Sequence, residues 1–182
     1  MHVGVLANVF KSYNNKEVEN DLMEFGYNVK NALESYAHKA TLLGIDNNAF
    51  ERLRKEKIDI AFNVCERING NALFEPHVAS MLEILNMPFT GSSSFTLATC
   101  MHKARARDIL KANNIPTPNY QIFYSCDEKL KLELNFPLIV KPESSHNSIG
   151  ILNNAVVKNI RELRRNIKNI IAIYKSRLWH VF

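Results

Sequence analysis

The chain has 182 residues, 46% of them apolar and 23% charged, which is the composition of a globular protein with one domain or two small ones. No apolar stretch approaches the roughly 20 residues needed to cross a bilayer, and the amino terminus lacks the features of a signal peptide, so we expect a cytoplasmic protein without a membrane segment. The formal net charge is +5, and the excess of Lys and Arg falls in residues 103–182. A basic half is typical of proteins that bind a polyanion, either nucleic acid or a nucleotide phosphate.

The first half alternates short apolar runs with amphipathic stretches. We expect strands at residues 2–9, 40–45, 58–64 and 87–91, and helices at 17–36, 48–56 and 74–85. Asp46 and Asn47 offer a cap to the helix that begins at residue 48. Strands that alternate with helices predict an α/β fold with a small parallel sheet covered on both faces.

A helix at 95–112 is followed by Asn113-Asn114-Ile-Pro-Thr-Pro, which must end it because proline fixes φ and lacks an amide donor. We therefore place a domain boundary there, between residues 1–113 and 114–182. In the second part we expect strands at 120–124, 136–140 and 147–152 and helices at 127–134 and 160–173.

The three cysteines, Cys65, Cys100 and Cys126, form no CxxC pair and are odd in number, which favours reduced thiols over a disulfide or zinc framework. His77 and His102 have no second ligand at i+4, so we expect no metal site at either.

The segment FPLIVKPESSHNSIGI, residues 136–151, is the strongest local signal. A hydrophobic strand delivers Lys141 to its end, and a Ser- and Asn-rich loop follows whose N–H groups and hydroxyls can donate to phosphate oxygens. An ordinary hairpin with an exposed lysine would have the same spacing. Neither GxxxxGK[ST] nor GxGxxG occurs, so a phosphate would be bound in another way.

Four segments in order resemble successive landmarks of D-alanine–D-alanine ligase-like ATP-grasp enzymes: AFNVCE (61–66), SMLEILNMPFTGSS (80–93), TCMHKARARDILKANNIPTP (99–118) and FPLIVKPESSHNSIGI (136–151). The resemblance implies a small parallel-sheet (pre-ATP-grasp) domain followed by the first, α+β part of an ATP-grasp domain. It also implies the reaction class: a carboxylate takes the γ-phosphoryl group of ATP to form an acyl phosphate, and an amine attacks it to give an amide, ADP and phosphate.

The resemblance assigns ATP-phosphate contacts to Lys103 and Lys141, whose charge would offset the charge of the moving phosphoryl group. It places Ser144, Ser145, Ser148 and Gly150 in the loop that covers the phosphates. This loop departs from the common Gly-Ser-Ser-x-Gly pattern at His146 and Asn147, so the substrate pair cannot be inferred from it.

Glu66 and Glu75 follow the third strand, and Asn63 lies near its end, at the edge where ligands bind in open parallel sheets. The family holds its substrate amine or carboxylate nearby, and an acidic side chain there can pair with an ammonium group. Surface glutamates that are simply solvated would fit the same pattern.

The resemblance implies Mg²⁺, because the family continues beyond Tyr174 into the acidic residues that hold this ion. This sequence has no such acidic cluster after Lys141, so the magnesium ligands are missing here. We therefore expect a C-terminally truncated member, inactive alone. The alternative is a non-catalytic nucleotide-binding or interaction module, such as one half of a split enzyme that forms a homodimer or binds a partner supplying the other half. A nucleic-acid role for Arg161 to Arg177 rests on charge alone, and we expect the apolar residues 174–182 to form an open edge that self-associates.

Overall fold

The computed structural model describes residues 1–8, 16–143, 155–174 and 179–181. Its contacts divide the chain into two compact units, Met1–Ala98 and Thr99–Phe182. This division differs from the boundary expected after residue 113, because helix α5 (Lys103–Ala112) is bonded to the second unit. Arg107 of α5 donates to the carbonyl of Pro118 at 3.0 Å, for example. Helix α4 (Ser94–Met101) carries the chain from one unit to the next.

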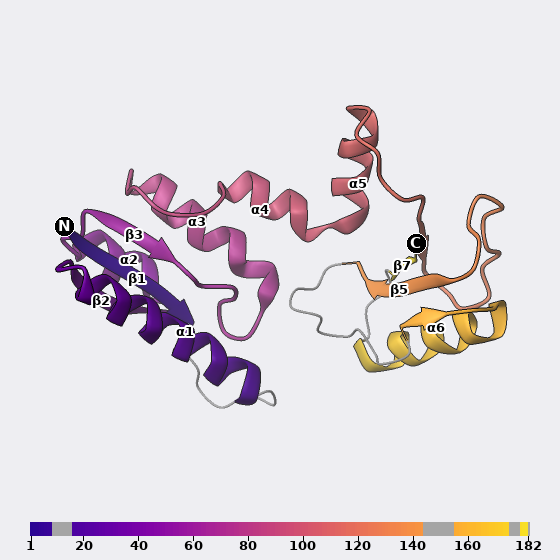
Figure 1. The fold of residues 1–182 in the computed structure, drawn as a ribbon, viewed down its shortest axis with the longest axis horizontal. Helices are drawn as coiled ribbons and strands as arrows, with labels where there is room; N and C mark the ends of the chain where they lie inside the picture. Colours follow the sequence, from indigo (N-terminus) through magenta and orange to yellow (C-terminus); the bar gives the residue numbers. More distant parts are fainter. Residues whose placement is uncertain (9–15, 144–154, 175–178, 182) are drawn as a thin grey trace. The chain divides into compact units, whose positions relative to one another are not determined.

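A three-stranded parallel sheet forms the centre of the first unit (Figure 1). Strand β1 (His2–Asn8) lies between β2 (Lys39–Ile45) and β3 (Ile60–Asn63). Six consecutive residues of β1 are buried, as expected for a strand covered on both faces. The predicted α/β class and parallel sheet are therefore confirmed.

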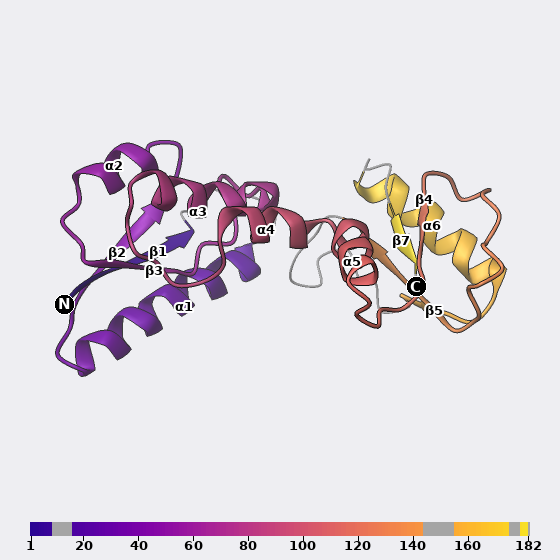
Figure 2. The same cartoon turned by 90° about the horizontal axis from the view of Figure 1, so that it is seen from above.

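The two faces of this sheet are covered by different helices (Figure 2). Helix α1 (Lys16–Ser35) packs closely on one face at Gly26, where an added Cβ would lie 3.0 Å from the Cβ of Ala7. The other face carries α2 (Ala49–Lys55) and α3 (Glu75–Ile84), and the short 3-10 helix η1 (Ala72–Phe74) directly precedes α3. Leu53 of α2 and Leu82 of α3 share one buried apolar cluster with Leu6 of β1. Because Leu6 and Ala7 are adjacent in the strand, they point to opposite faces.

The predicted fourth strand, residues 87–91, is not a full strand in the structure. This segment makes a single parallel bridge between Phe89 and Ala61 of β3. The backbone of Ala61 donates to the carbonyl of Pro88 at 2.8 Å and accepts from the amide of Thr90 at 3.0 Å. The segment therefore lies beside β3 at the position expected, with too few pairs to form a ladder.

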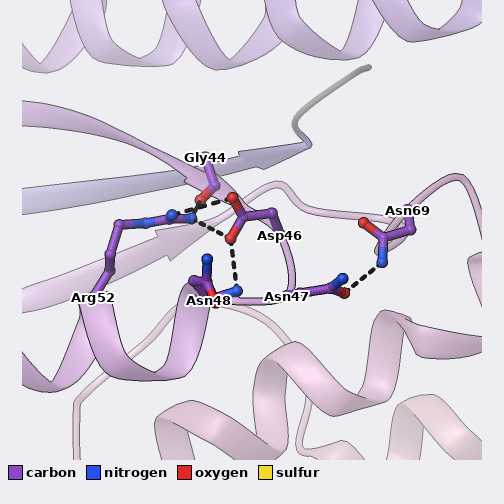
Figure 3. A network of polar contacts seen from close by, with 6 residues as sticks. All are labelled: Gly44, Asp46, Asn47, Asn48, Arg52 and Asn69. Carbon is purple, nitrogen blue, oxygen red and sulfur yellow. Dashed lines mark hydrogen bonds and ion pairs between the residues drawn. The ribbon is translucent and has the colours of Figure 1, made fainter. Parts of the chain in front are cut away.

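Asp46 fixes the turn from β2 to α2 (Figure 3). Its carboxylate accepts the backbone N–H of Asn48 at 2.8 Å and pairs with the Arg52 guanidinium at 2.8 Å, while Arg52 also donates to the carbonyl of Gly44. Asn48 is the residue at the N-cap position, and its side chain makes no capping bond. Asp46 was predicted to cap this helix. It instead accepts the amide of the N-cap residue Asn48 and so fixes the turn that leads into the helix.

The second unit is an antiparallel sheet with a helix packed on it. Strands β4 (Gln121–Phe123), β5 (Leu138–Pro142), β6 (Val156–Val157) and β7 (Trp179–Val181) lie in the order β4-β7-β5-β6. Helix α6 (Ile160–Tyr174) buries Leu163, Ile167 and Ile170, a spacing of three to four residues that keeps one face on the sheet.

Two helix predictions in this half are wrong in detail. The helix expected at 95–112 is two helices, α4 and α5, separated by His102, whose backbone is extended. The helix expected at 127–134 is absent. Those residues form turns, because the Glu128 carboxylate accepts the backbone N–H groups of Tyr124 at 2.6 Å and Ser125 at 2.7 Å and so holds the chain in a bend. The hairpin strand expected at 147–152 lies outside the described residues, and β5 pairs instead with β6.

The expectation of an open edge in residues 174–182 is also wrong for the described part of this segment. The backbone of β7 pairs antiparallel with β4 on one side and β5 on the other. An inner strand has no free edge, so the physical basis for self-association through this backbone is absent.

Candidate functional site

The first group of candidate residues lies in the second unit, where α5 begins beside the end of β5. Lys103 is the first residue of α5 and Lys141 lies on β5. Glu143 connects the two elements: its carbonyl accepts both the backbone amide and the ammonium group of Lys103 at 3.3 Å, and its carboxylate accepts the amide of Ala104 at 2.9 Å. Glu143, which is 4% exposed, therefore ties the start of α5, with Lys103, to the chain two residues after Lys141.

Electrostatics in this lysine pair, Lys103 and Lys141, fit a site for an anion. Burial lowers the pKa of Lys103, the Glu143 carboxylate acts in the opposite direction, and the positive charge of Lys141 lowers it further. The two ammonium groups thus repel each other, and an anion placed between them would relieve that repulsion.

The second group lies in the first unit, where a cavity of about 290 Å³ opens at the carboxyl edge of the parallel sheet. Asn63, Glu66 and Glu75 all line it, together with Cys65 and Thr90. We call it the acidic cavity. The structure therefore brings together the three residues that sequence alone had placed only approximately.

The loop after β3 is held in place by two asparagines. The Asn63 side chain accepts the amide of Cys65 at 3.1 Å, which turns the chain directly after the strand. Asn8, at the end of β1 and 2% exposed, accepts the amide of Glu66 at 3.0 Å and donates to the carbonyl of Arg67 at 3.0 Å. Sequence reasoning missed Asn8, whose signal was an amide side chain at the end of the apolar run of β1.

Charge in the acidic cavity favours a cation or a shared proton. Burial raises the pKa of Glu75 to about 7, and the nearby Glu66 carboxylate adds to this effect. Burial also raises the pKa of the Cys65 thiol to about 12, so this cysteine is protonated and unreactive at neutral pH. An ammonium group entering the cavity would stabilise Glu75 in its charged form.

A larger cavity, of about 490 Å³, lies in the second unit between α5 and the residues around β4. Its lining includes Arg107, Asp108 and Tyr120, none of which sequence reasoning selected. The Tyr120 hydroxyl donates to Asp108 at 2.7 Å, and burial together with this bond raises the pKa of Tyr120 to about 12. Tyr120 and Asp108 are thus bonded to each other, which favours a structural role for this pair.

No protein-family model matches the chain. Two curated relatives do: the D-alanine–D-alanine ligase of Carboxydothermus hydrogenoformans is 30% identical over 191 residues, which is 100% of this chain and 57% of the relative. D-alanine–D-alanine ligase B of Pseudomonas putida is 31% identical over 166 residues, which is 90% of this chain and 50% of the relative. The chain belongs to the D-alanine–D-alanine ligase-like family. It spans about half the length of the curated relatives it matches.

Solved structures show the same fold. The structure of D-alanine–D-alanine ligase from Bacillus anthracis complexed with ATP superposes with a TM-score of 0.74 at 22% sequence identity, covering 100% of this chain and 57% of that one. The predicted order of a small parallel sheet followed by an α+β part therefore agrees with the front of a known ligase fold.

Some predicted site residues cannot be placed. Ser144, Ser145, Ser148 and Gly150 lie outside the described residues. In the described part of the chain no three His, Cys, Asp or Glu side chains gather in a way that could hold a metal ion, and no described helix is long and apolar enough to cross a membrane. His77 stands edge-on to Phe74, with 5.3 Å between ring centroids.

Proposed function

We propose that this chain provides ATP-phosphate contacts and part of the substrate site of an ADP-forming carboxylate–amine ligase. The observation that carries the proposal is that Glu143, two residues after Lys141, bonds to Lys103 and that the charge of Lys141 acts on Lys103, in a fold shared with ligases. Lys103 and Lys141 are far apart in the sequence. They belong to one region because the fold places the start of α5 beside the end of β5.

The chemistry required of the lysine pair is electrostatic. A nucleotide brings several negative charges, and two ammonium groups that repel each other are stabilised when a phosphate lies between them. As the γ-phosphoryl group moves to a carboxylate, the pair would offset charge that shifts between oxygens. Ser144, Ser145, Ser148 and Gly150 belong to this proposal as the loop over the phosphates.

The acidic cavity would hold the amine of a substrate. Asn63, Glu66 and Glu75 surround a space large enough for a small amino acid or a comparable amine. A Glu75 pKa of about 7 means that the carboxyl group is partly protonated at neutral pH and can exchange a proton with an ammonium group of the ligand.

Magnesium, which the resemblance implies, does not fit the described residues. Mg²⁺ binds through carboxylate oxygens and substrate phosphates, and within residues 1–8, 16–143, 155–174 and 179–181 no three acidic or imidazole side chains converge. We therefore derive no step through this ion.

Because the chain spans about half the length of its relatives, we propose binding for the chain itself and ligation for a protein that also contains the remaining part. An assay of ADP release with paired carboxylates and amines distinguishes this proposal from a non-catalytic binding module. Turnover by the chain alone would contradict the division we propose, and turnover restored by adding the remaining part would support it.

Calorimetry with ADP tests the nucleotide site. Lys103→Ala and Lys141→Ala should each weaken binding by about 10-fold or more, since a charge-assisted hydrogen bond contributes about 1.5–3 kcal/mol. Lys111→Ala is the matched control, because Lys111 is an exposed lysine in the last turn of the same helix. We expect weak affinity in the parent chain, because a chain of about half the length of its relatives would leave much of the nucleotide surface in water. Equal affinity in the parent and in both site variants would exclude the lysine pair.

A further inference from the structure

Arg67 is a buried cation that the proposed function does not use. Its residue is 4% exposed, and its Nε and Nη2 atoms are buried without a hydrogen-bond partner in the part of the chain that the structure describes. A guanidinium is always charged in proteins. A buried charge without hydrogen-bond acceptors is strongly unfavourable. The Nε and Nη2 atoms of Arg67 therefore indicate that a ligand supplies the acceptors.

The identity of the two atoms restricts the ligand. Nε–H and Nη2–H lie on one edge of the planar guanidinium and donate in parallel. This two-pronged edge matches the two oxygens of a carboxylate at hydrogen-bond distance, which is the reason that arginine recognises such groups bidentately. A neutral ligand with one acceptor would leave one donor unsatisfied.

The backbone of Arg67 is fixed at the edge of the sheet where ligands bind. Its carbonyl accepts from the Asn8 amide at 3.0 Å and from the Cys65 thiol at 3.2 Å, so the loop is tied both to the end of β1 and to itself. Figure 1 shows β1 and β3 pointing toward this same edge. In open parallel sheets this is the edge that receives ligands.

Arg67 also neighbours the acidic cavity. Cys65, two residues earlier, lines that cavity, and the positive charge of Arg67 acts on its thiol. The cavity and the arginine are therefore parts of one region of the first unit, built by the same loop.

We propose that Arg67 binds the carboxylate of a small-molecule ligand through its Nε and Nη2 hydrogens. This inference rests on the proposed function, in which the ligand class is a carboxylate–amine substrate, and it names the residue that recognises the carboxylate.

Thermal unfolding with a minimal carboxylate tests the inference. A ligand that binds only the folded state raises its melting temperature. Acetate at several times its Kd should raise the melting temperature of the parent chain by about 2–4 °C over potassium chloride of equal ionic strength. Acetamide, which has the same shape without the charge, should have no effect.

Two variants make the test specific. Arg67→Met should lose the acetate response. Arg54→Met, which removes an exposed arginine paired with Glu51 in the same unit, should retain it. Equal responses in the parent and both variants would overturn the inference, as would a parent chain that responds to phosphate and not to acetate.

A second measurement covers the case in which Arg67→Met does not fold. In the ¹⁵N spectrum of the parent chain, one arginine Nε–H signal should move on titration with acetate, and Arg67→Lys should lack that signal. An acetate titration that leaves every arginine Nε–H signal in place would refute the proposal. Because neither experiment contains a nucleotide, this inference can fail while the lysine-dependent binding of ADP stands.

Discussion

Replacing Glu143 should show how strongly one carboxylate holds the start of α5. In Glu143→Ala the amide of Ala104 loses its 2.9 Å acceptor, and Ala104 is 5% exposed, so water replaces the bond poorly. A buried amide without an acceptor costs about 1–3 kcal/mol, and loss of a helix cap costs about 1 kcal/mol. The two figures describe the same hydrogen bond and are not added. We therefore expect the free energy of unfolding of the second unit to fall by about 2 kcal/mol.

Glu143→Gln separates hydrogen bonding from charge. Glutamine keeps an oxygen for the Ala104 amide and removes only the negative charge near the first turn of α5, which contributes about 0.3–1 kcal/mol. The single tryptophan, Trp179, lies in β7, so its fluorescence during urea unfolding follows this unit. For a urea dependence of about 1–3 kcal/mol per molar, the alanine variant should shift the midpoint down by roughly 1 M.

The exposed Glu133 provides the control, and Glu133→Ala should stay within about 0.5 kcal/mol of the parent. If the alanine and glutamine variants of Glu143 were equally stable, the bond to Ala104 would not be what holds the helix, and our account of how the two lysines are brought together would fail.

Three further predictions concern the first unit's site, the turn from β2 to α2 and the core of the second unit. Glu75 has a pKa of about 7 in place of its usual 4.5, so the folded state binds more protons than the unfolded state between these values and stability should fall as the pH rises through that window, by about 1–2 kcal/mol after allowing for solvent screening of a half-buried group. Denaturant titrations at pH 4.5 and 7.5 check this, and Glu75→Gln should remove the difference. Asp46→Ala should cost about 1 kcal/mol, measured by thermal unfolding, because it removes both the turn bond to Asn48 and a partly exposed ion pair with Arg52; an unchanged melting temperature would contradict it. Ile167→Ala should cost about 2–5 kcal/mol by tryptophan fluorescence, because its side chain is fully buried in the core of the second unit, and a smaller loss would mean that the core collapses around the gap.

The sequence was most informative where the pattern of apolar residues is long. β1 could be predicted because it is a continuous apolar run, and α6 because its buried residues recur every three to four positions. The short β7 has three residues, too few for a period to show, and its place between β4 and β5 depends on partners distant in sequence.

The sequence indicated the lysines of the candidate site. It did not indicate residues whose role depends on where the fold places them. Lys141 follows an apolar strand and is conspicuous, whereas Glu143, two residues later, has no pattern that would mark it as the buried link to α5. At residues 127–134 we predicted a short helix, but the Glu128 carboxylate accepts backbone amides in a turn and so competes with helical bonds.

The strand order β4-β7-β5-β6 has a consequence for synthesis. β4 and β5 emerge from the ribosome early, yet they do not pair with each other, because the position between them belongs to a strand that follows α6. At about 5–20 residues per second, both wait several seconds with open edges. A nascent chain in this interval presents backbone that other chains can pair with. Translation speed through α6 therefore becomes a factor in yield, and a chaperone that covers strand edges should help this protein more than one that covers apolar helices.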